Sequence, residues 1–534
     1  MPRFRAARIP FTRTRPTGKR SLRRRTFLTL GCTAMAAGAS WGTNWLVVYT
    51  GRDRSNVGTL GFRTSLRIPE LLAPRASAGG RRWYELTLAA GQTGLLPGKK
   101  TETWGANGSY LAPTLRVRDG DAVDIAVRND LPQPTTLHWH GMHLPASMDG
   151  GPHQMIPPGE TWRPRWTVHQ PAATLWYHPH PHGSTGAHVY RGVAGLIIVD
   201  DEHTAGSGLP HEYGVDDVPL IIQDKNFHDD GSLDFTETTF SEDIAAADNL
   251  GVLGDTILVN GTYDPQFAVT TERVRFRLLN GSNARVYELG FPDGRSFHLV
   301  ATENGLLPRP QELKRLPLAP GERAEIVLAF KPGDEAVLRS FRPDLGAGFP
   351  TRRFSGGDDT FDIIALRAAR TLKPSPPLPT RFTGAPPAIK VPDSPRIRTF
   401  ELIGTRINGR SMDMNRVDEV IPAGATEIWE IKRGDGLVHA FHVHGATFNV
   451  LEVNGEQPPP QMRGPKDTVF PPRDGTIRVA IRFDTLTDER VPYMYHCHVL
   501  RHEDDGMMGQ FLVVEPGREE QVPRNLRTDE SVHH

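Results

Sequence analysis

Short runs in which apolar and polar residues alternate recur along most of this chain. Three examples are LRVRDGDAVDIAVRN (115–129), VRFRLLN (274–280) and AEIVLAF (324–330), with Gly, Pro, Asp or Asn close to their ends. A period of two puts every second side chain on one face, which is typical of half-buried β-strands. Long amphipathic helical stretches are missing, so the pattern predicts an all-β protein built from sandwiches.

The two ends of the chain carry the same succession of motifs. The first copy consists of HWHG (138–141), WYHPHPHG (176–183) and GVAGLIIVD (192–200). The second copy consists of HVHG (442–445), YHCH (495–498) and GMMGQFLVVE (506–515). Each has two His-x-His pairs, a Gly-x-x-Gly turn and a closing apolar strand, so we infer two domains related by duplication.

The region between these copies has similar strand patterns without a His-x-His pair, and we interpret it as a third copy that serves as a spacer. At 534 residues the chain is long enough for about three or four domains. The expected segments are a leader at 1–50, domains at 65–200, 201–372 and 391–517, a Pro-rich linker at 373–390 and a polar tail at 518–534.

Charge gives no sign of a nucleic-acid partner, because Lys+Arg and Asp+Glu both total 62. Basic residues do crowd the first 25 positions, where Arg23-Arg24-Arg25-Thr26-Phe27-Leu28 precedes an apolar run that reaches about Ala39. This pattern predicts a twin-arginine signal, with the twin-arginine export machinery as a partner. The alternative is an ordinary basic signal peptide or a signal anchor. We expect a periplasmic or extracellular protein, anchored to the membrane if the leader is not cleaved.

The chain has only two cysteines, Cys32 in the leader and Cys497 in HCHVLRHEDDGM (496–507). An exported mature protein with one thiol can form no internal disulfide, so Cys497 needs another reason to be there. A small buried hydrophobic residue is one interpretation. The position between two histidines favours a metal thiolate, and a Cys with a nearby His and Met is the ligand set of a blue-copper site.

On an extended strand, side chains two residues apart share a face. His442 and His444 therefore point one way, and His439, an odd number of residues from both, groups with Cys497. The first metal site is then His439, Cys497 and His502, with Met507 as a weak axial ligand. Eight histidines remain in four His-x-His pairs: His138, His140, His178, His180, His442, His444, His496 and His498. Eight imidazoles suit three copper ions that keep open positions for a small substrate.

The motifs HWHG, WYHPHPHG, HAFHVHG (439–445) and HCHVLRHEDDGM resemble the four copper signatures of three-domain multicopper oxidases. The similarity is to bacterial members, namely laccases, the spore-coat laccase and bilirubin oxidase group, and the periplasmic cuprous oxidase, and it spans about residues 70–516. The resemblance implies three consecutive cupredoxin-like Greek-key β-sandwich domains and four copper ions, one type 1, one type 2 and two type 3. One departure is Ala440, where many members have Pro.

The resemblance also implies which residues bind each ion. His138 and His442 would bind the type 2 copper, and His439, Cys497 and His502, with axial Met507, would bind the type 1 copper. Six residues would bind the type 3 pair: His140, His178, His180, His444, His496 and His498.

In such an enzyme a reducing substrate gives single electrons to type 1 copper, and Cys497 passes them through His496 and His498 to a cluster that reduces O₂ to water. Asp149 and Glu503 match acidic positions that family members place near the cluster, and they would act as proton relays. The alternative is that one is a turn residue and the other a solvated loop residue. The axial Met507 implies a lower type 1 potential than Leu or Phe would give, which favours phenols and aromatic amines as donors. A monomer is expected.

Three other functions fit parts of the sequence. A cuprous oxidase for copper tolerance would use Cu(I) as its donor, but this chain has no Met-rich insert and only Met412 and Met414 in the relevant region. An exported cell-division protein of the same fold has lost the copper ligands, whereas all twelve positions are filled here. A copper nitrite reductase is disfavoured, because its type 2 site does not need four His-x-His pairs.

Overall fold

The structure is a computed structural model that describes residues 54–76, 81–236, 250–349, 351–483 and 486–526. The twin-arginine motif, Cys32 and the end of the polar tail lie outside the described residues. The described part is nearly all β, in six sheets that pack as cupredoxin-like sandwiches, which confirms the predicted fold class. No helix within these ranges combines the length and the apolar character needed to cross a membrane.

The first sandwich contains residues that precede position 201. One sheet has the order β2-β3-β6-β8 with β4 and β9 attached: β2 (Arg75–Ala76), β3 (Arg82–Thr93), β4 (Thr101–Ala106), β6 (Ala122–Asp130), β8 (Thr161–Trp162) and β9 (Arg165–Thr167). The other has the order β5-β11-β10-β7: β5 (Leu115–Arg118), β7 (His138–His140), β10 (Ala173–His178) and β11 (Gly195–Asp200). Two short helices, η1 (Ala146–Met148) and α2 (Thr185–Arg191), lie in its connections.

The middle sandwich also has two sheets. The first has the order β1-β15-β23-β22-β17-β20: β1 (Thr64–Ser65), β15 (Pro265–Thr271), β17 (Tyr287–Gly290), β20 (Arg315–Leu318), β22 (Glu335–Phe341) and β23 (Phe361–Lys373). The second has the order β14-β13-β12-β16-β21-β18-β19: β12 (Asp217–Lys225), β13 (Thr256–Val259), β14 (Thr262–Tyr263), β16 (Arg273–Asn280), β18 (Phe297–Thr302), β19 (Gly305–Leu313) and β21 (Arg323–Ala329). The short helices are η2 (Thr204–Gly206) and α3 (Thr351–Phe354).

The C-terminal sandwich repeats this plan. One sheet has the order β25-β24-β27-β32-β29-β30: β24 (Ile397–Ile403), β25 (Arg406–Ile407), β27 (Thr426–Arg433), β29 (Ala446–Val453), β30 (Pro465–Lys466) and β32 (Thr476–Phe483). The other has the order β26-β34-β33-β28-β31: β26 (Glu419–Pro422), β28 (Phe441–Val443), β31 (Thr468–Val469), β33 (Asp488–Cys497) and β34 (Met508–Val514). The short helices are η3 (Pro460–Met462) and α4 (Leu500–Asp504).

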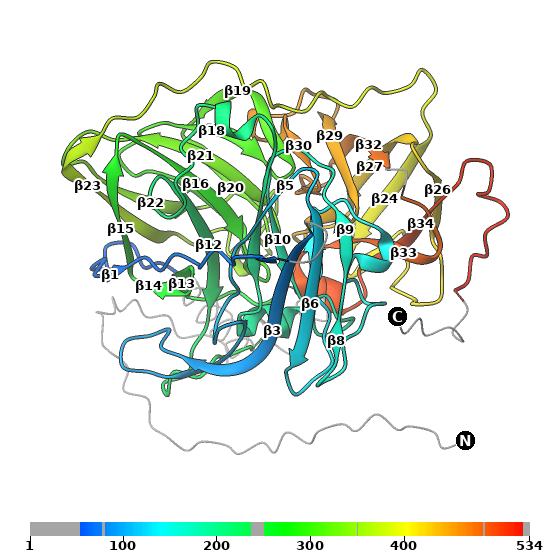
Figure 1. Ribbon diagram of the computed structural model, residues 1–534, viewed down its shortest axis with the longest axis horizontal. Helices are drawn as coiled ribbons and strands as arrows, with labels where there is room; N and C mark the ends of the chain where they lie inside the picture. Colours follow the sequence, from blue (N-terminus) through cyan, green and yellow to red (C-terminus); the bar gives the residue numbers. More distant parts are fainter. Residues whose placement is uncertain (1–53, 77–80, 237–249, 350, 484–485, 527–534) are drawn as a thin grey trace, which may run out of the picture. The chain divides into compact units, whose positions relative to one another are not determined.

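One sheet of each sandwich has the same four-strand arrangement, in which a parallel pair is followed by two antiparallel neighbours. The strands are β5-β11-β10-β7 in the first sandwich, β15-β23-β22-β17 in the middle one and β26-β34-β33-β28 in the last. In the outer two copies the last two strands carry histidines, whereas β17 and β22 carry none. Figure 1 labels β5 and β10 of the first copy, β15, β22 and β23 of the second and β26, β33 and β34 of the third.

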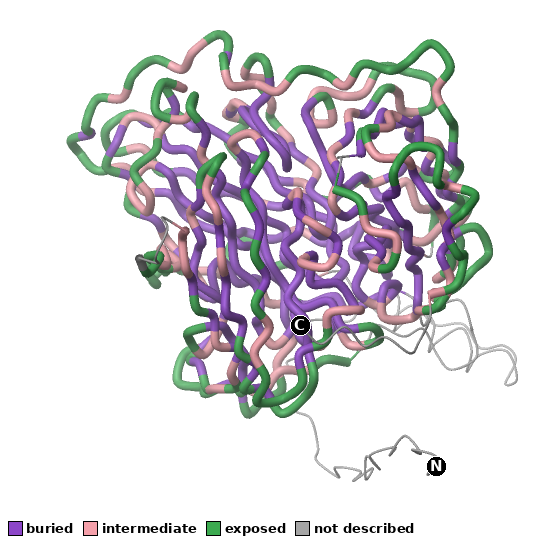
Figure 2. The backbone as a smooth tube through the Cα atoms, turned by 45° about the vertical axis from the view of Figure 1, so that its right-hand side comes forward, coloured by how far each residue is buried: buried purple, intermediate pink, exposed green. Residues whose placement is uncertain are grey.

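Each sandwich has its own large apolar core. Alternate residues of the strands fill these cores, as in β3, where Tyr84, Leu86 and Leu88 are all buried. Buried stretches follow the strands and exposed stretches follow the connections (Figure 2). The four-strand sheets of the two outer sandwiches therefore present their histidines from a rigid, close-packed base.

Candidate metal centres

Cross-strand register brings histidines of each outer sandwich together. His138 on β7 is paired with His178 on β10, and His442 on β28 is paired with His496 on β33. The partners in each pair belong to different His-x-His motifs that lie far apart in sequence. The eight paired-motif histidines form one buried group, here called the histidine cluster: His138, His140, His178, His180, His442, His444, His496 and His498.

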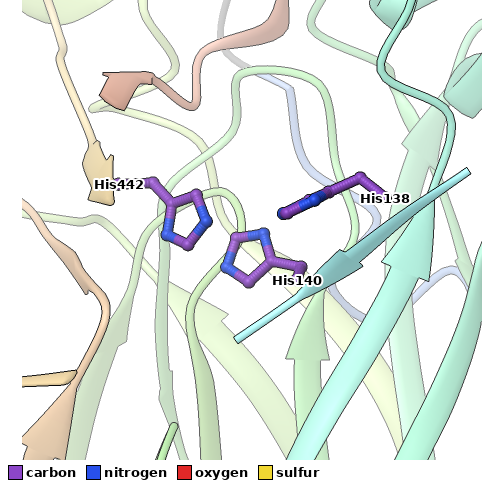
Figure 3. Close-up of side chains that lie close together, drawn as sticks. All are labelled: His138, His140 and His442. Carbon is purple, nitrogen blue, oxygen red and sulfur yellow. The ribbon is translucent and has the colours of Figure 1, made fainter. Parts of the chain in front are cut away.

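Within the histidine cluster, ring nitrogens converge in three groups whose nitrogens lie within 4.8 Å of one another. The groups are His138, His140 and His442, then His140, His178 and His498, then His180, His444 and His496. Figure 3 shows the first group, with the rings of His138 and His140 from β7 turned toward His442 from β28. Every group combines the first and the last sandwich, so the cluster lies where these two meet.

Backbone carbonyls determine which ring nitrogen faces the cluster. Nδ1 lies 2.9 Å from the Asp149 carbonyl in His138, 2.9 Å from the Asp467 carbonyl in His442 and 2.8 Å from the Pro179 carbonyl in His178. A carbonyl can only accept, so Nδ1 carries the hydrogen and Nε2 keeps its lone pair. The Nε2 atoms of all three rings are buried and have no hydrogen-bond partner.

These unpartnered nitrogens fit a metal site better than a packed core. Burial lowers the pKa of His140, His178, His444, His496 and His498 well below the ordinary value, and lowers that of His180 to about 3. The rings are therefore neutral, which is the form that binds metal ions. In the third group, His496 Nε2 lies 3.2 Å from His180 Nε2 and 3.1 Å from His444 Nε2, an arrangement that a cation between the rings stabilises.

A second buried group, here called the cysteine site, consists of His439, Cys497, His502 and Met507. The Cys497 Sγ lies 3.7 Å from His439 Nδ1 and 3.4 Å from His502 Nδ1. Met507 is fully buried, and its carbonyl accepts a hydrogen bond of 3.0 Å from the Cys497 N–H. The other nitrogen of His439, Nε2, lies 3.0 Å from an oxygen of Asp435, which orients the ring.

The chemistry of Cys497 also fits a metal thiolate. Burial raises the pKa of the Cys497 thiol to about 12, so without a metal ion the sulfur stays protonated and unreactive. Its sequence neighbours His496 and His498 belong to two different groups of the histidine cluster. One strand end therefore joins the cysteine site to the histidine cluster through two peptide bonds.

The structure places both sequence-predicted acids beside the cluster. Asp149 Oδ2 lies 2.7 Å from His444 Nδ1, and the Asp149 carbonyl lies next to His138. Glu503 Oε1 lies 3.4 Å from His180 Nδ1, and Oε2 lies 3.2 Å from His496 Nδ1. Both Glu503 oxygens are buried without a well-aligned hydrogen bond, and burial raises its pKa. Asp149 follows η1 directly, so it is a turn residue as well as a neighbour of the cluster.

Asp467 is a site residue that the motifs do not reveal. It is fully buried, its Oδ1 lies 3.2 Å from His140 Nε2, and its carbonyl holds His442 as described above. Arg323 of the middle sandwich forms a two-pronged ion pair with it, at 2.8 and 2.6 Å. Burial alone would raise the pKa of Asp467, but Arg323 and His140 hold it well below its ordinary value. Because Asp467 contacts Nε2 of His140 and Nδ1 of His442, the other nitrogen of each ring, Nδ1 of His140 and Nε2 of His442, faces the cluster.

The middle sandwich touches the cluster directly at Gly321. This residue has a φ of +83°, and a Cβ atom there would lie 2.7 Å from Cδ2 of His498. Gly141, directly after the first His-x-His pair, has a φ of +85° and the same lack of space, because a Cβ would lie 2.6 Å from Arg323 Nη2. The middle sandwich carries no histidine of the cluster, yet its Gly321 packs against the ring of His498.

Three cupredoxin-like sandwiches with a cysteine site joined to a histidine cluster define a metalloprotein with several linked copper-type centres. Two family models, both described as multicopper oxidase, match this chain, one at residues 88–204 and the other at residues 374–517. Multicopper oxidase mco of Staphylococcus aureus is 36% identical over 465 residues, which are 86% of this chain and 94% of that protein.

Two further proteins are similar over most of the chain. Cell division protein FtsP of Rahnella sp. (strain Y9602) is 36% identical over 500 residues, which are 92% of this chain and 99% of that protein. The crystal structure of a laccase from Pediococcus acidilactici Pa5930 has a TM-score of 0.75 at 34% identity, covering 85% of this chain and 94% of that one. The chain belongs to the multicopper oxidase family and has the fold of its bacterial members, so copper is the metal and oxidoreduction the general chemistry.

Proposed function

We propose that the protein couples the one-electron oxidation of phenols or aromatic amines to the four-electron reduction of O₂ to water. Four copper ions would be bound, one type 1 ion at the cysteine site and one type 2 and two type 3 ions at the histidine cluster. Bound copper supplies the one-electron chemistry and the place where O₂ reacts. The convergence of unpartnered, neutral imidazole nitrogens from two sandwiches is the single observation that carries the proposal.

In this proposal the chain itself provides the route between the two sites. Electrons enter at the cysteine site, and the backbone on either side of Cys497 leads to His496 and His498. No side chain has to move, since the three residues are consecutive and buried. A rigid connection of this kind keeps the donor away from the place where oxygen is reduced.

The reduction of one O₂ consumes four protons, and Glu503 and Asp149 are proposed as their carriers. Glu503 fits this role because its two buried oxygens face His180 and His496 on the same side of the cluster. Asp149 approaches from the first sandwich through His444. Each would hold a proton on a carboxylate oxygen within reach of the buried site.

The test combines spectroscopy with oxygen uptake. Copper-loaded protein is expected to show a blue thiolate band, EPR signals of type 1 and type 2 copper, and O₂ consumption with 2,6-dimethoxyphenol. Total copper should approach four ions per chain. A blue band without O₂ consumption would reject the oxidase function, and failure to bind copper after reconstitution would favour a scaffold role such as the name of the FtsP relative suggests.

Oxidation of Cu(I) is a second candidate function. Met412 is half-buried, and its N–H donates a 2.8 Å hydrogen bond to the carbonyl of Gly506, directly before Met507. A thioether near the cysteine site is a ligand that Cu(I) prefers. Comparison of the initial rates with Cu(I) and with 2,6-dimethoxyphenol separates the two donors, and Met412→Leu should reduce only the former.

The proposal also covers the localisation of the protein, which we expect to be exported by the twin-arginine pathway. Arg24 and Arg25, followed by Thr26-Phe27-Leu28, carry the signal in the sequence, and a protein that takes up metal before export suits a pathway for folded proteins. Replacement of both arginines by lysine should keep the protein in the cytoplasm. Normal export of that variant would contradict this assignment.

A further inference from the structure

One buried arginine of the structure differs from the others in its surroundings. Four arginine side chains are almost completely buried: Arg277, Arg285, Arg323 and Arg433. Three of them form ion pairs with buried carboxylates, at 2.6 Å for Arg277 with Asp217, 2.7 Å for Arg285 with Asp224 and 2.6 Å for Arg323 with Asp467. Among the described residues, Arg433 has no carboxylate in ion-pair contact. A buried guanidinium without a counter-charge is costly, so its presence needs an explanation.

Arg433 is held by carbonyl groups instead. Its guanidinium donates hydrogen bonds to the carbonyls of Leu345 at 2.8 Å, Gly436 at 3.2 Å and Pro471 at 3.3 Å, while Nε has no partner. These carbonyls belong to three separate segments, one of them in the middle sandwich. The guanidinium is therefore held in place by three backbone carbonyls.

The fixed charge is bound to the loop that leads to the cysteine site. Arg433 ends β27, and the loop that follows, bound through Gly436, leads directly to His439. Asp435 of the same loop is already engaged: one oxygen lies next to His439 Nε2 and accepts the Leu437 N–H, and the other accepts the Gly404 N–H. The Asp435 carboxylate therefore orients the His439 ring and stabilises the loop.

Electrostatic effects run in both directions between Arg433 and the metal-binding side chains. Burial lowers the pKa of Arg433 to about 10, and Asp435 and the thiolate form of Cys497 oppose that shift. Arg433 in turn contributes to the lowered pKa of His439, after the larger effect of burial. The guanidinium is charged at neutral pH and interacts electrostatically with Cys497 and His439.

We propose that Arg433 is a positioning residue that raises the reduction potential of the type 1 copper and thereby offsets the lowering expected from axial Met507. This inference rests on the proposed function, because it requires copper at the cysteine site. An oxidised site of one Cu²⁺, one thiolate and two neutral imidazoles carries one more positive charge than the reduced site. A fixed cation nearby disfavours the more positive, oxidised form. Donors that are harder to oxidise then become usable.

The experiment is spectroelectrochemical titration of the blue band in copper-loaded protein. Arg433→Gln keeps N–H donors for the carbonyls and removes the charge, so the equilibrium constant for one-electron reduction should fall about threefold to tenfold, a tenfold fall being about 59 mV. Arg433→Lys keeps the charge and should remain within about twofold of the parent protein. Arg398→Gln is the matched control, because Arg398 is buried in the same sandwich but paired with Glu419 and Glu427.

A second variant keeps the inference testable if Arg433→Gln does not fold. The ring of Phe470 lies 5.7 Å from the guanidinium carbon and is half-buried, so Phe470→Glu supplies the missing counter-charge while Arg433 remains. It should lower the potential in the same direction as Arg433→Gln. An unchanged potential in Phe470→Glu or Arg433→Gln overturns the inference, as does an equal fall in Arg433→Lys. Absence of the blue band from the copper-loaded parent protein would instead reject the proposed function.

Discussion

The cysteine site and the histidine cluster differ in how much of the chain each one needs. The cysteine site, which consists of His439, Cys497, His502 and Met507, belongs entirely to the C-terminal sandwich. The histidine cluster takes four rings from each outer sandwich, and Arg323 and Gly321 of the middle one complete its surroundings. The first takes its side chains from two segments of a single sandwich, the loop before β28 and the segment from the end of β33 to β34. The second exists only when all three sandwiches are packed, so changes at distant positions should affect it alone.

The largest expected effect comes from removing Cys497, the residue that links the cysteine site to the histidine cluster. Cys497→Ser should abolish the blue band and reduce donor oxidation about a thousandfold or more, because the proposed electron route begins at this sulfur. Copper analysis should still find three ions per chain, since the histidine cluster keeps all its imidazoles. Oxidation at the parent rate would refute the route through Cys497.

Glu503→Gln should separate chemistry at the cluster from electron entry. The amide cannot deliver a proton as the carboxyl does, so kcat should fall about a hundredfold and its solvent isotope effect should change. Anaerobic reduction of the blue band by the donor should keep its rate. Asp505→Asn is the control, because Asp505 follows the same short helix but pairs with Arg501 at the surface. Equal losses in both variants would mean that the helix, and not the carboxyl, matters.

Asp467→Asn should damage the histidine cluster and spare the cysteine site. The lost charge leaves Arg323 unpaired and weakens the orientation of His140, so copper affinity or activity should fall about tenfold to a hundredfold. The blue band should persist while the type 2 EPR signal declines. Asp359→Asn is the matched control, since Asp359 is also buried and paired with an arginine, Arg285, but contacts no ring of the cluster. If the two variants lose copper equally, the ion pair has only a general structural role.

Gly321→Ala tests the contact between the middle sandwich and His498. A methyl group would meet the ring at 2.7 Å, so we expect about a tenfold loss of activity with an unchanged blue band. Gly333→Ala provides the comparison, because Gly333 has a similar φ of +78° but open space around its Cβ position. It should cost only about 1 kcal/mol of unfolding free energy, from backbone strain. Identical behaviour of the two would show that strain alone accounts for the effect.

The smallest expected effect concerns β17, the middle-sandwich equivalent of the histidine strand β7. Burial raises the pKa of Glu288 on this strand to about 7, with Arg315 opposing. The folded state therefore binds this proton more tightly than the unfolded state, and stability falls as the pH rises from about 4.5 to about 7. Glu288→Gln should remove this loss and gain about 1–2 kcal/mol at pH 8, after allowance for partial exposure, with little change at pH 4. Urea unfolding at both pH values checks this, with exposed Glu335→Gln as the control.

The sequence was sufficient for the residues that recur in motifs. Alternating patterns predict the strands, and the duplicated His-x-His pairs follow from the shared strand order of the outer sandwiches. The parity argument predicts that His439 groups with Cys497, but it depends on an assumption that differs from the structure. It takes the chain as extended from 439 to 444, whereas β28 covers only Phe441–Val443, and His439 lies in the preceding loop.

Residues that act on the sites from other segments were beyond the reach of sequence patterns. Asp467 and Arg323 lie 144 positions apart, and neither belongs to a motif or a periodic run. In the sequence, Arg433 resembles any residue at the end of a strand, and Gly321 resembles any glycine in a turn. Their roles depend on which surfaces of three sandwiches meet, and local propensities carry no information on such contacts.

The contact of Arg323, Asp467 and His140 has a consequence for how such proteins can be recombined. Each member of this trio comes from a different sandwich, so a sandwich taken from a relative must bring a matching side chain at this corner. This trio does not restrict the exchange of loops on the outer surface, because those loops carry none of its contacts. Chimeras made by cutting between the sandwiches should therefore recover oxygen chemistry only when the corner is restored, even where each part folds well.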